Sequence, residues 1–266
     1  MVYSRSMYSQ GKRNEAKGSD RKRPFLPSAS VGFLWLLLAF HPSHAQTPSG
    51  GAKPGGVLQS GFAAEEITPA PGARMPGSFG ERFGKEVTDP VYAVAAVFTD
   101  GMTSVALVGI DALFVTRDSV RPAREAIEKE TGIPGANVLI GASHTHSGGP
   151  IASCLACEAD PAYQAEVARK IAAAVGRAWA ARKPAEIAVA TGKEDTIAFN
   201  RRFVVKSGRE VTHPGKPGTP HHDDVVRVAG PIDPDVGVLA VRDPGGAVRG
   251  IVVNYACHAT VMWGAG

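Results

Sequence analysis

The sequence predicts an α/β fold in which helices flank a mixed β-sheet. Two apolar segments, residues 91–99 and 104–110, flank Asp100-Gly101, a strong turn signal, and therefore predict a β-hairpin. A segment with helical spacing and then a short apolar strand, residues 137–141, follow. A strand, a helix and a strand in this order predict a right-handed crossover, so residues 104–110 should run parallel to residues 137–141.

Two helices are predicted on the faces of this sheet. The spacing of Val120, Ala123 and Ile127 predicts the first helix, and Gly132 predicts its end. The second helix should begin after Asp160, a good N-cap followed by proline, and run to about residue 182. Its apolar residues recur every four positions and form one stripe for the core: Tyr163, Val167, Ile171, Val175 and Trp179.

The remaining segments predict further strands and one long loop. Strands are expected near residues 187–191 and 196–199. Residues 207–231 are polar and rich in Gly, Pro and His, which predicts a loop. A last hairpin is expected from residues 236–243 and 248–256, because a Pro-Gly-Gly sequence separates these two apolar segments.

Composition favours a globular protein and argues against a nucleic-acid-binding surface. The 266 residues are 44% hydrophobic and 20% charged, which suffices for one sizeable core. The formal net charge is +4, but residues 1–30 alone carry seven Lys and Arg against two acidic residues. The rest of the chain therefore has a net charge of −1, so we expect no nucleic-acid partner.

The N-terminal region is typical of an exported protein. The basic start is followed by the apolar run of residues 31–40 and by small residues at Ser43 and Ala45. This pattern predicts a secretory signal peptide over residues 1–45, with cleavage near Ala45 and a secreted or periplasmic protein. The alternatives are an uncleaved anchor and a later start, for example at Met7. Residues 46–60 predict a Gly/Pro/Ser linker, and residues 61–266 should form the folded domain.

Four polar residues follow predicted strands and are candidates for a site. Asp111 ends residues 104–110, His144 and His146 follow residues 137–141, and His258 follows the last strand. Ligands gather at the carboxyl ends of strands in sheets with parallel character. In an extended segment, the two histidines of an H-x-H sequence point to the same side and can reach one Zn²⁺. A carboxylate behind an imidazole raises its basicity, a role that suits Asp111.

Each of these residues also has a simpler interpretation. The H-x-H pair with Ser147 and two glycines could form an ordinary turn, and His258 could be a hydrogen-bonded core residue. Cys154 and Cys157 form an isolated C-x-x-C sequence, which favours a local disulfide or two unreactive thiols over a metal site or a redox site. The three other histidines in the polar loop region are expected to be solvated: His213, His221 and His222.

Taken together, the motifs resemble the neutral/alkaline (non-lysosomal) ceramidase family, specifically its N-terminal catalytic domain. The resemblance includes "GFAAEEITP" (61–69), "NVLIGASHTHSGGP" (137–150), "FNRRF" (199–203) and "NYACHAT" (254–260). It implies a mixed β-sheet sandwich flanked by helices. It also implies the use of zinc-activated water to hydrolyse an N-acyl amide, ceramide, to a fatty acid and sphingosine.

The resemblance also implies a role for individual residues. His144 and His258 match zinc ligands, and His146 matches a histidine that positions the reacting oxygen. Arg201 matches an arginine that borders the active site. A small amide or sphingolipid substrate would follow, with peripheral contact to membrane lipid. The sequence leaves the oligomeric state open.

Two departures from the family pattern limit these expectations. An extra glycine gives H-S-G-G-P where the family has H-S-G-P. The family also completes its zinc shell with a glutamate and a tyrosine further along the chain, and neither can be assigned before Gly266. We therefore expect a fold that is incomplete at the C-terminus, a partial zinc site and little activity by this chain itself. The alternatives are a zinc hydrolase of another amide or ester, and a non-catalytic secreted module with the same fold.

Overall fold

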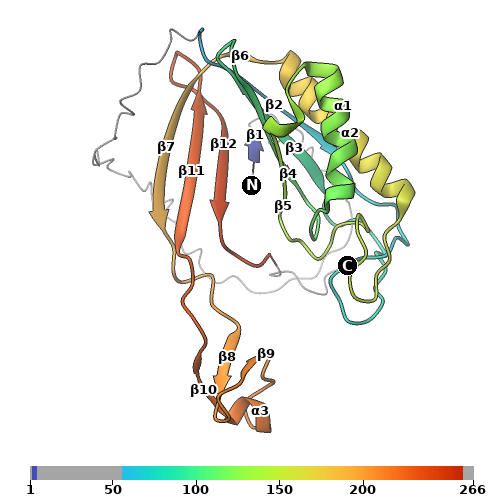
Figure 1. Ribbon diagram of the computed structural model, residues 1–266, viewed down its shortest axis with the longest axis vertical. Coiled ribbons are helices and arrows are strands. Elements are labelled where there is room, and N and C mark those ends of the chain that lie inside the picture. The colour runs from blue at the N-terminus through green and yellow to red at the C-terminus, as the bar shows by residue number, and fades with distance from the viewer. Residues whose placement is uncertain (1, 5–55, 260–266) are drawn as a thin grey trace, which may run out of the picture. The chain divides into compact units, whose positions relative to one another are not determined.

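A five-stranded mixed sheet forms the centre of the computed structural model, which describes residues 2–4 and 56–259 (Figure 1). Its strands are β2 (Gln59–Glu66), β3 (Tyr92–Thr99), β4 (Ser104–Ile110), β5 (Val138–Ala142) and β6 (Lys183–Pro184), in the order β5-β4-β3-β2-β6. Only the β4–β5 pair is parallel, which confirms the predicted parallel pairing of these two segments.

The predicted hairpin between β3 and β4 is confirmed, and its turn explains why it forms. The Asp100 carboxylate accepts hydrogen bonds from the backbone N–H groups of Met102 (2.9 Å) and Thr103 (2.7 Å). These bonds lower the pKa of Asp100 and favour its charged form. Gly101 has a φ of 86°, a left-handed conformation that glycine adopts without steric penalty.

Two helices cover one face of this sheet (Figure 1). Helix α1 (Arg117–Thr131) begins with a capping box at Thr116 and ends at Gly132, whose φ is 73°. Helix α2 (Pro161–Ala180) begins after the Asp160 cap, as predicted, and the short 3₁₀ helix η2 (Gly135–Asn137) precedes β5. Their apolar faces and the sheet form the core, which includes Ala106, Val108, Ile110, Ile127, Ile140, Ile171 and Val175.

A second, antiparallel sheet lies on the other side of the first. Its strands are β7 (Glu186–Lys193), β11 (Asp235–Arg242), β12 (Val248–Tyr255) and β1 (Val2–Ser4), in the order β1-β12-β11-β7. The Phe62 ring of β2 packs directly over Gly250 of β12. The Arg249 side chain donates hydrogen bonds to the carbonyls of Ser60 (2.9 Å) and Pro184 (3.3 Å). These contacts form the expected α/β sandwich with helices outside.

A third, small sheet lies partly within the region that was predicted to be a loop. It contains β8 (Arg202–Val205), β9 (Glu210–Thr212) and β10 (Val225–Val228), and α3 (Pro220–Asp223) lies between β9 and β10. The predicted loop at 207–231 was therefore wrong in part. The predicted strand at 196–199 was also wrong: the Thr196 N–H donates to the Glu194 carboxylate (2.7 Å), and this local turn replaces strand pairing.

The predicted signal peptide, residues 1–45, and the predicted linker, residues 46–60, are described only in small part. The predicted signal peptide lies outside the described residues except for Val2–Ser4, which form β1, and the predicted linker is described only from residue 56.

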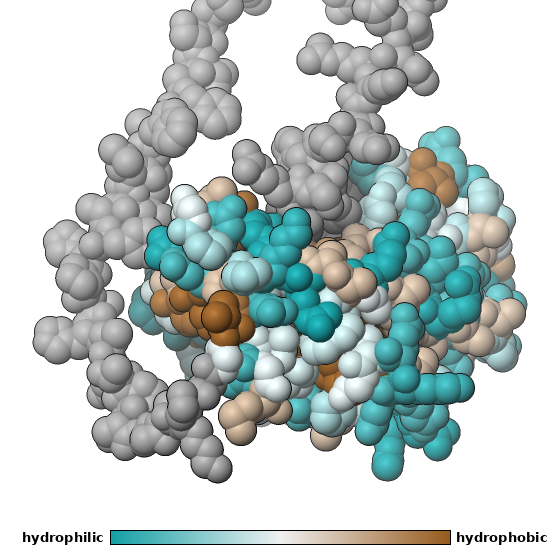
Figure 2. All heavy atoms as spheres, turned by 90° about the horizontal axis from the view of Figure 1, so that it is seen from above, coloured by the Kyte–Doolittle hydropathy of each residue, from teal (hydrophilic) through white to brown (hydrophobic). Residues whose placement is uncertain are grey.

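No helix in the described part of the chain is long and apolar enough to cross a membrane. On the face shown in Figure 2, hydrophobic side chains form separate patches among hydrophilic ones.

The close packing of β2 on α2 can be tested at Gly61. An added Cβ would collide with the backbone carbonyl oxygen of Ala178 and approach the Arg182 nitrogen. We expect Gly61→Ala to lower the free energy of unfolding by about 2 kcal/mol, because neither backbone can move freely. Gly192→Ala is the matched control, since it lies in a strand with open space around the added Cβ. Urea denaturation measures both; equal stability of the two variants would contradict this packing.

Candidate metal centre

Three histidines from distant parts of the sequence converge beside the two large sheets. His144 and His146 follow β5, whereas His258 follows β12. One ring nitrogen of each lies within 4.8 Å of the others, and the ring centroids are 4.7–5.1 Å apart. The structure therefore brings together all three histidines that the sequence singled out.

Main-chain carbonyls fix the orientation of two of these rings. Nδ1 of His144 lies 2.7 Å from the Leu113 carbonyl oxygen, and Nδ1 of His146 lies 3.0 Å from that of Gly77. Because a carbonyl only accepts, each Nδ1 must carry the proton and donate. Both Nε2 atoms are then left with lone pairs, the state in which an imidazole binds a metal.

The donor set fits a zinc ion. Nε2 of His146 lies 3.3 Å from Nε2 of His258. Two nitrogens bound at 2.0–2.1 Å in a tetrahedral shell lie about 3.3 Å apart, so this pair already has the separation of two zinc ligands. Zinc sites normally use three or four protein ligands, and three imidazoles are within reach here.

The surroundings lower the pKa of two of these imidazoles, those of His146 and His258. Burial lowers the pKa of His146, the Gly77 carbonyl opposes this effect, and the charges of His144, Arg82 and Arg201 lower the pKa further. Burial is also the largest cause that lowers the pKa of His258, followed by Arg201 and the neighbouring histidines. Since only a neutral imidazole offers a lone pair, both shifts favour the protonation state that metal binding requires.

The backbone around the H-T-H segment is held in an unusual, close-packed conformation. His144 has a φ of 61°, in the left-handed region that non-glycine residues rarely adopt. A Cβ at Gly77 would collide with the His146 ring, and one at Gly148 would lie 2.7 Å from the Asp111 carbonyl oxygen. Such strain is characteristic of functional sites, where the surroundings hold a residue in place.

The other two predicted site residues, Asp111 and Arg201, have different surroundings. The Asp111 carboxylate accepts a hydrogen bond from the Tyr92 N–H (3.0 Å), while the carbonyls of Leu113 and Gly77 orient the rings of His144 and His146. Arg201 is close enough for its charge to affect His146 and His258. Sequence reasoning missed Arg82, which donates to the His146 carbonyl (3.3 Å), because no motif marks it.

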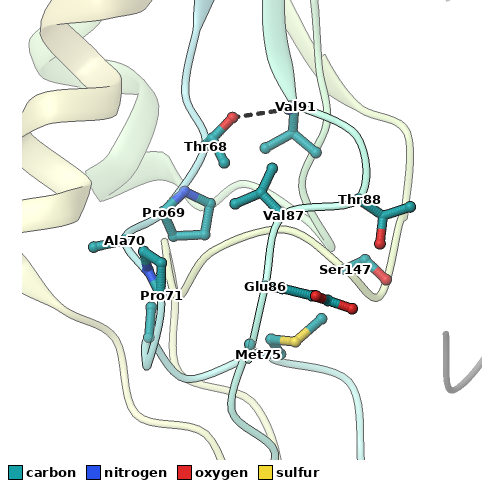
Figure 3. A pocket seen from close by; sticks show the side chains of 12 residues that line it. Thr68, Pro69, Ala70, Pro71, Met75, Glu86, Val87, Thr88, Val91 and Ser147 are labelled. Atoms are coloured by element: carbon teal, nitrogen blue, oxygen red, sulfur yellow. Dashed lines mark hydrogen bonds between the residues drawn. The ribbon is translucent and has the colours of Figure 1, made fainter. Parts of the chain in front are cut away.

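Two cavities border residues of this centre. One, of about 420 Å³, is lined by Arg201, Phe203, His213 and His222 together with residues of the small sheet. The other, of about 90 Å³, lies between the segment after β2 and Ser147, the residue that follows His146. Figure 3 shows Pro69, Val87 and Ser147 around this smaller cavity, and a hydrogen bond from the Val91 N–H to Thr68 (3.1 Å).

The α/β sandwich has counterparts among solved structures. One is neutral ceramidase from Pseudomonas aeruginosa, with a TM-score of 0.61 and 20% sequence identity. A second, described as ceramidase complexed with C2, has a TM-score of 0.57 and 19% identity. Each match covers 77% of this chain and 32% of the other.

These matches establish that the chain has a neutral-ceramidase-like fold. The chain spans about a third of the length of the ceramidases it matches. No protein-family model and no curated protein sequence matches it. The similarity that the sequence motifs suggested is therefore supported at the level of fold.

Zinc affinity tests the proposed ligands. We expect His144→Ala and His258→Ala each to lower Zn²⁺ affinity at least about tenfold, because each removes a ring nitrogen from the cluster. His221→Ala is the control, since His221 is exposed and lies outside the cluster. Competition with a chromophoric chelator measures the affinity. A loss in His146→Ala as large as in His144→Ala would assign His146 as a third ligand, whereas equal affinity in all variants would contradict the site.

Proposed function

We propose that this protein is a zinc-dependent hydrolase of ceramidase type that cleaves an N-acyl amide such as ceramide into a fatty acid and sphingosine. The observation that carries the proposal is the convergence of three histidine imidazoles, two of them oriented by main-chain carbonyls, on a ceramidase-like fold. The pattern of residues 1–45 supports the further proposal that the protein is exported.

We assign different roles in this reaction to the three histidines and to Arg201. His144 and His258 would hold the zinc ion, and His146 would act as a third ligand or position the reacting oxygen. When bound, zinc makes water nucleophilic at neutral pH and polarises the acyl carbonyl. Arg201 has no ion pair with any carboxylate in the described part of the chain, so its charge is available to stabilise the oxyanion that develops on the substrate.

An apolar rim beside the centre supports a lipid substrate. The segment that supplies the Gly77 carbonyl also exposes three large apolar side chains: Phe79, Phe83 and Val87. Phe79 is 87% exposed, and an apolar ligand or membrane lipid that covered it would remove this apolar surface from water. We propose that this rim contacts the acyl or sphingoid chain.

Hydrolysis of a short-chain labelled ceramide tests the proposed reaction. The protein expressed from its complete coding region should release the labelled fatty acid, lose this activity with a zinc chelator and regain it with added Zn²⁺. His144→Ala should abolish the release, whereas His221→Ala should not change it. Hydrolysis of an ester or another amide, but not of ceramide, would show that the substrate is not ceramide. Absence of both zinc and hydrolysis would favour a non-catalytic module.

Two adjacent arginines offer a matched test of Arg201. Arg201→Gln should lower kcat at least about tenfold with little change in Tm, because it removes a charge beside the reacting carbonyl. Arg202→Gln is the control, because Arg202 forms an exposed ion pair with Glu210 (3.5 Å). Steady-state kinetics of both variants measure the difference. Equal losses of activity would show that Arg201 acts only through the structure of this segment.

A further inference from the structure

The loop between His146 and α2 contains a small β-hairpin with a cysteine on each side. The N–H of Cys154 donates to the Cys157 carbonyl (2.8 Å), and the N–H of Cys157 donates to the Cys154 carbonyl (3.0 Å). Two more bonds close the base of the hairpin: Asp160 N–H to the Pro150 carbonyl (2.9 Å) and Ala159 N–H to the Ser153 hydroxyl (3.0 Å). The two cysteines are therefore held directly opposite each other.

This pairing places both thiols within reach of one another. Residues directly opposite in an antiparallel pair project to the same side, and the Cα atoms of a hydrogen-bonded pair are about 5.5 Å apart. Disulfides span Cα distances of about 4.4–6.8 Å, so the backbone already satisfies this requirement. Both thiols are free in the structure, with Cys157 buried and Cys154 partly exposed.

We propose that Cys154 and Cys157 are a reversible redox site that switches between a dithiol and a disulfide in the loop next to the metal centre. The proposal does not rest on the proposed hydrolase activity, because it concerns only these two thiols and the hairpin that carries them.

Two features of the hairpin make the disulfide reversible rather than permanent. Opposite Cβ atoms in such a pair are about 4.5–5.5 Å apart, whereas a disulfide brings them to about 3.8 Å, and the resulting strain makes the bond easier to reduce. Leu155, at the tip, has a φ of 53°, the positive value of a type II′ turn, where glycine is preferred. A strained bond at an exposed tip has the properties of a labile disulfide.

The exposure of the two thiols sets the order of the reaction with a disulfide oxidant such as oxidised glutathione. The Cys154 thiolate attacks one glutathione sulfur and displaces one glutathione thiolate, which leaves a mixed disulfide on Cys154. The Cys157 thiolate then attacks Cys154 Sγ and displaces the second glutathione. The two cysteines lose two electrons and two protons, and the oxidant becomes two glutathione thiols.

The surroundings of Cys157 suit its place as the second thiol to react. Burial raises the pKa of the Cys157 thiol, and the nearby Arg74 guanidinium opposes this effect only in part. Cys157 is therefore shielded from the bulky oxidant and less ready than an ordinary thiol to attack it. Cys154, at the more accessible position, meets the oxidant first.

Mass analysis of the full chain tests this assignment. In a Cys257→Ser background, the protein is equilibrated with glutathione buffers of increasing oxidised fraction, quenched in acid and alkylated. We expect both alkyl labels to be lost together, with a mass about 2 Da below that of the dithiol protein and no glutathione retained. An excess of reduced glutathione should restore both labels.

Single variants test the order of the two steps. Cys157→Ser should stop at a glutathione adduct on Cys154, whereas Cys154→Ser should leave Cys157 unmodified. Circular dichroism verifies that the variants fold. If a variant fails to fold, the alkylation result for the protein with both cysteines still decides the proposal. Two labelled thiols at every buffer ratio would overturn it, as would a persistent glutathione adduct on Cys154 beside a free Cys157.

Discussion

The contact between the two large sheets is the interaction on which the candidate site depends. His144 and His146 follow β5 of the first sheet, while His258 follows β12 of the second. Phe62 over Gly250 and the Arg249 hydrogen bonds to Ser60 and Pro184 fix the sheets against each other. Because the histidine nitrogens must lie within a few ångströms to share an ion, a small shift between the sheets would separate the cluster.

Much of the fold follows from local sequence signals. Asp100-Gly101 specifies its hairpin through bonds within the turn, and Asp160 caps α2 with its own side chain. The small sheet was missed because its pairing joins short segments that are far apart, Val205 with Val225 for example, across a stretch rich in Gly and Pro. Such pairing depends on tertiary packing, which short-range pattern reasoning cannot include.

In the candidate site, too, some features could be predicted from the sequence and others depend on the folded backbone. The H-x-H spacing and the positions of the histidines after apolar strands predicted the cluster, and the ceramidase resemblance identified His258 as their partner. The carbonyls of Leu113 and Gly77 could not be predicted, because every residue has a carbonyl and only the folded backbone decides which one faces a ring. Arg82 likewise gains its place only through the contact of its segment with His146.

The choice of carbonyls over carboxylates as partners of the rings has a chemical consequence. A carboxylate behind an imidazole adds negative charge and makes the ring a stronger donor, whereas a neutral carbonyl fixes the orientation with a smaller effect. Arg82 and Arg201 further make the potential at this centre more positive. A bound cation would therefore be held less tightly than in a carboxylate-supported site, and it would withdraw electrons more strongly from a coordinated carbonyl. The same charges that would weaken the binding of a cation here would increase its electrophilic strength.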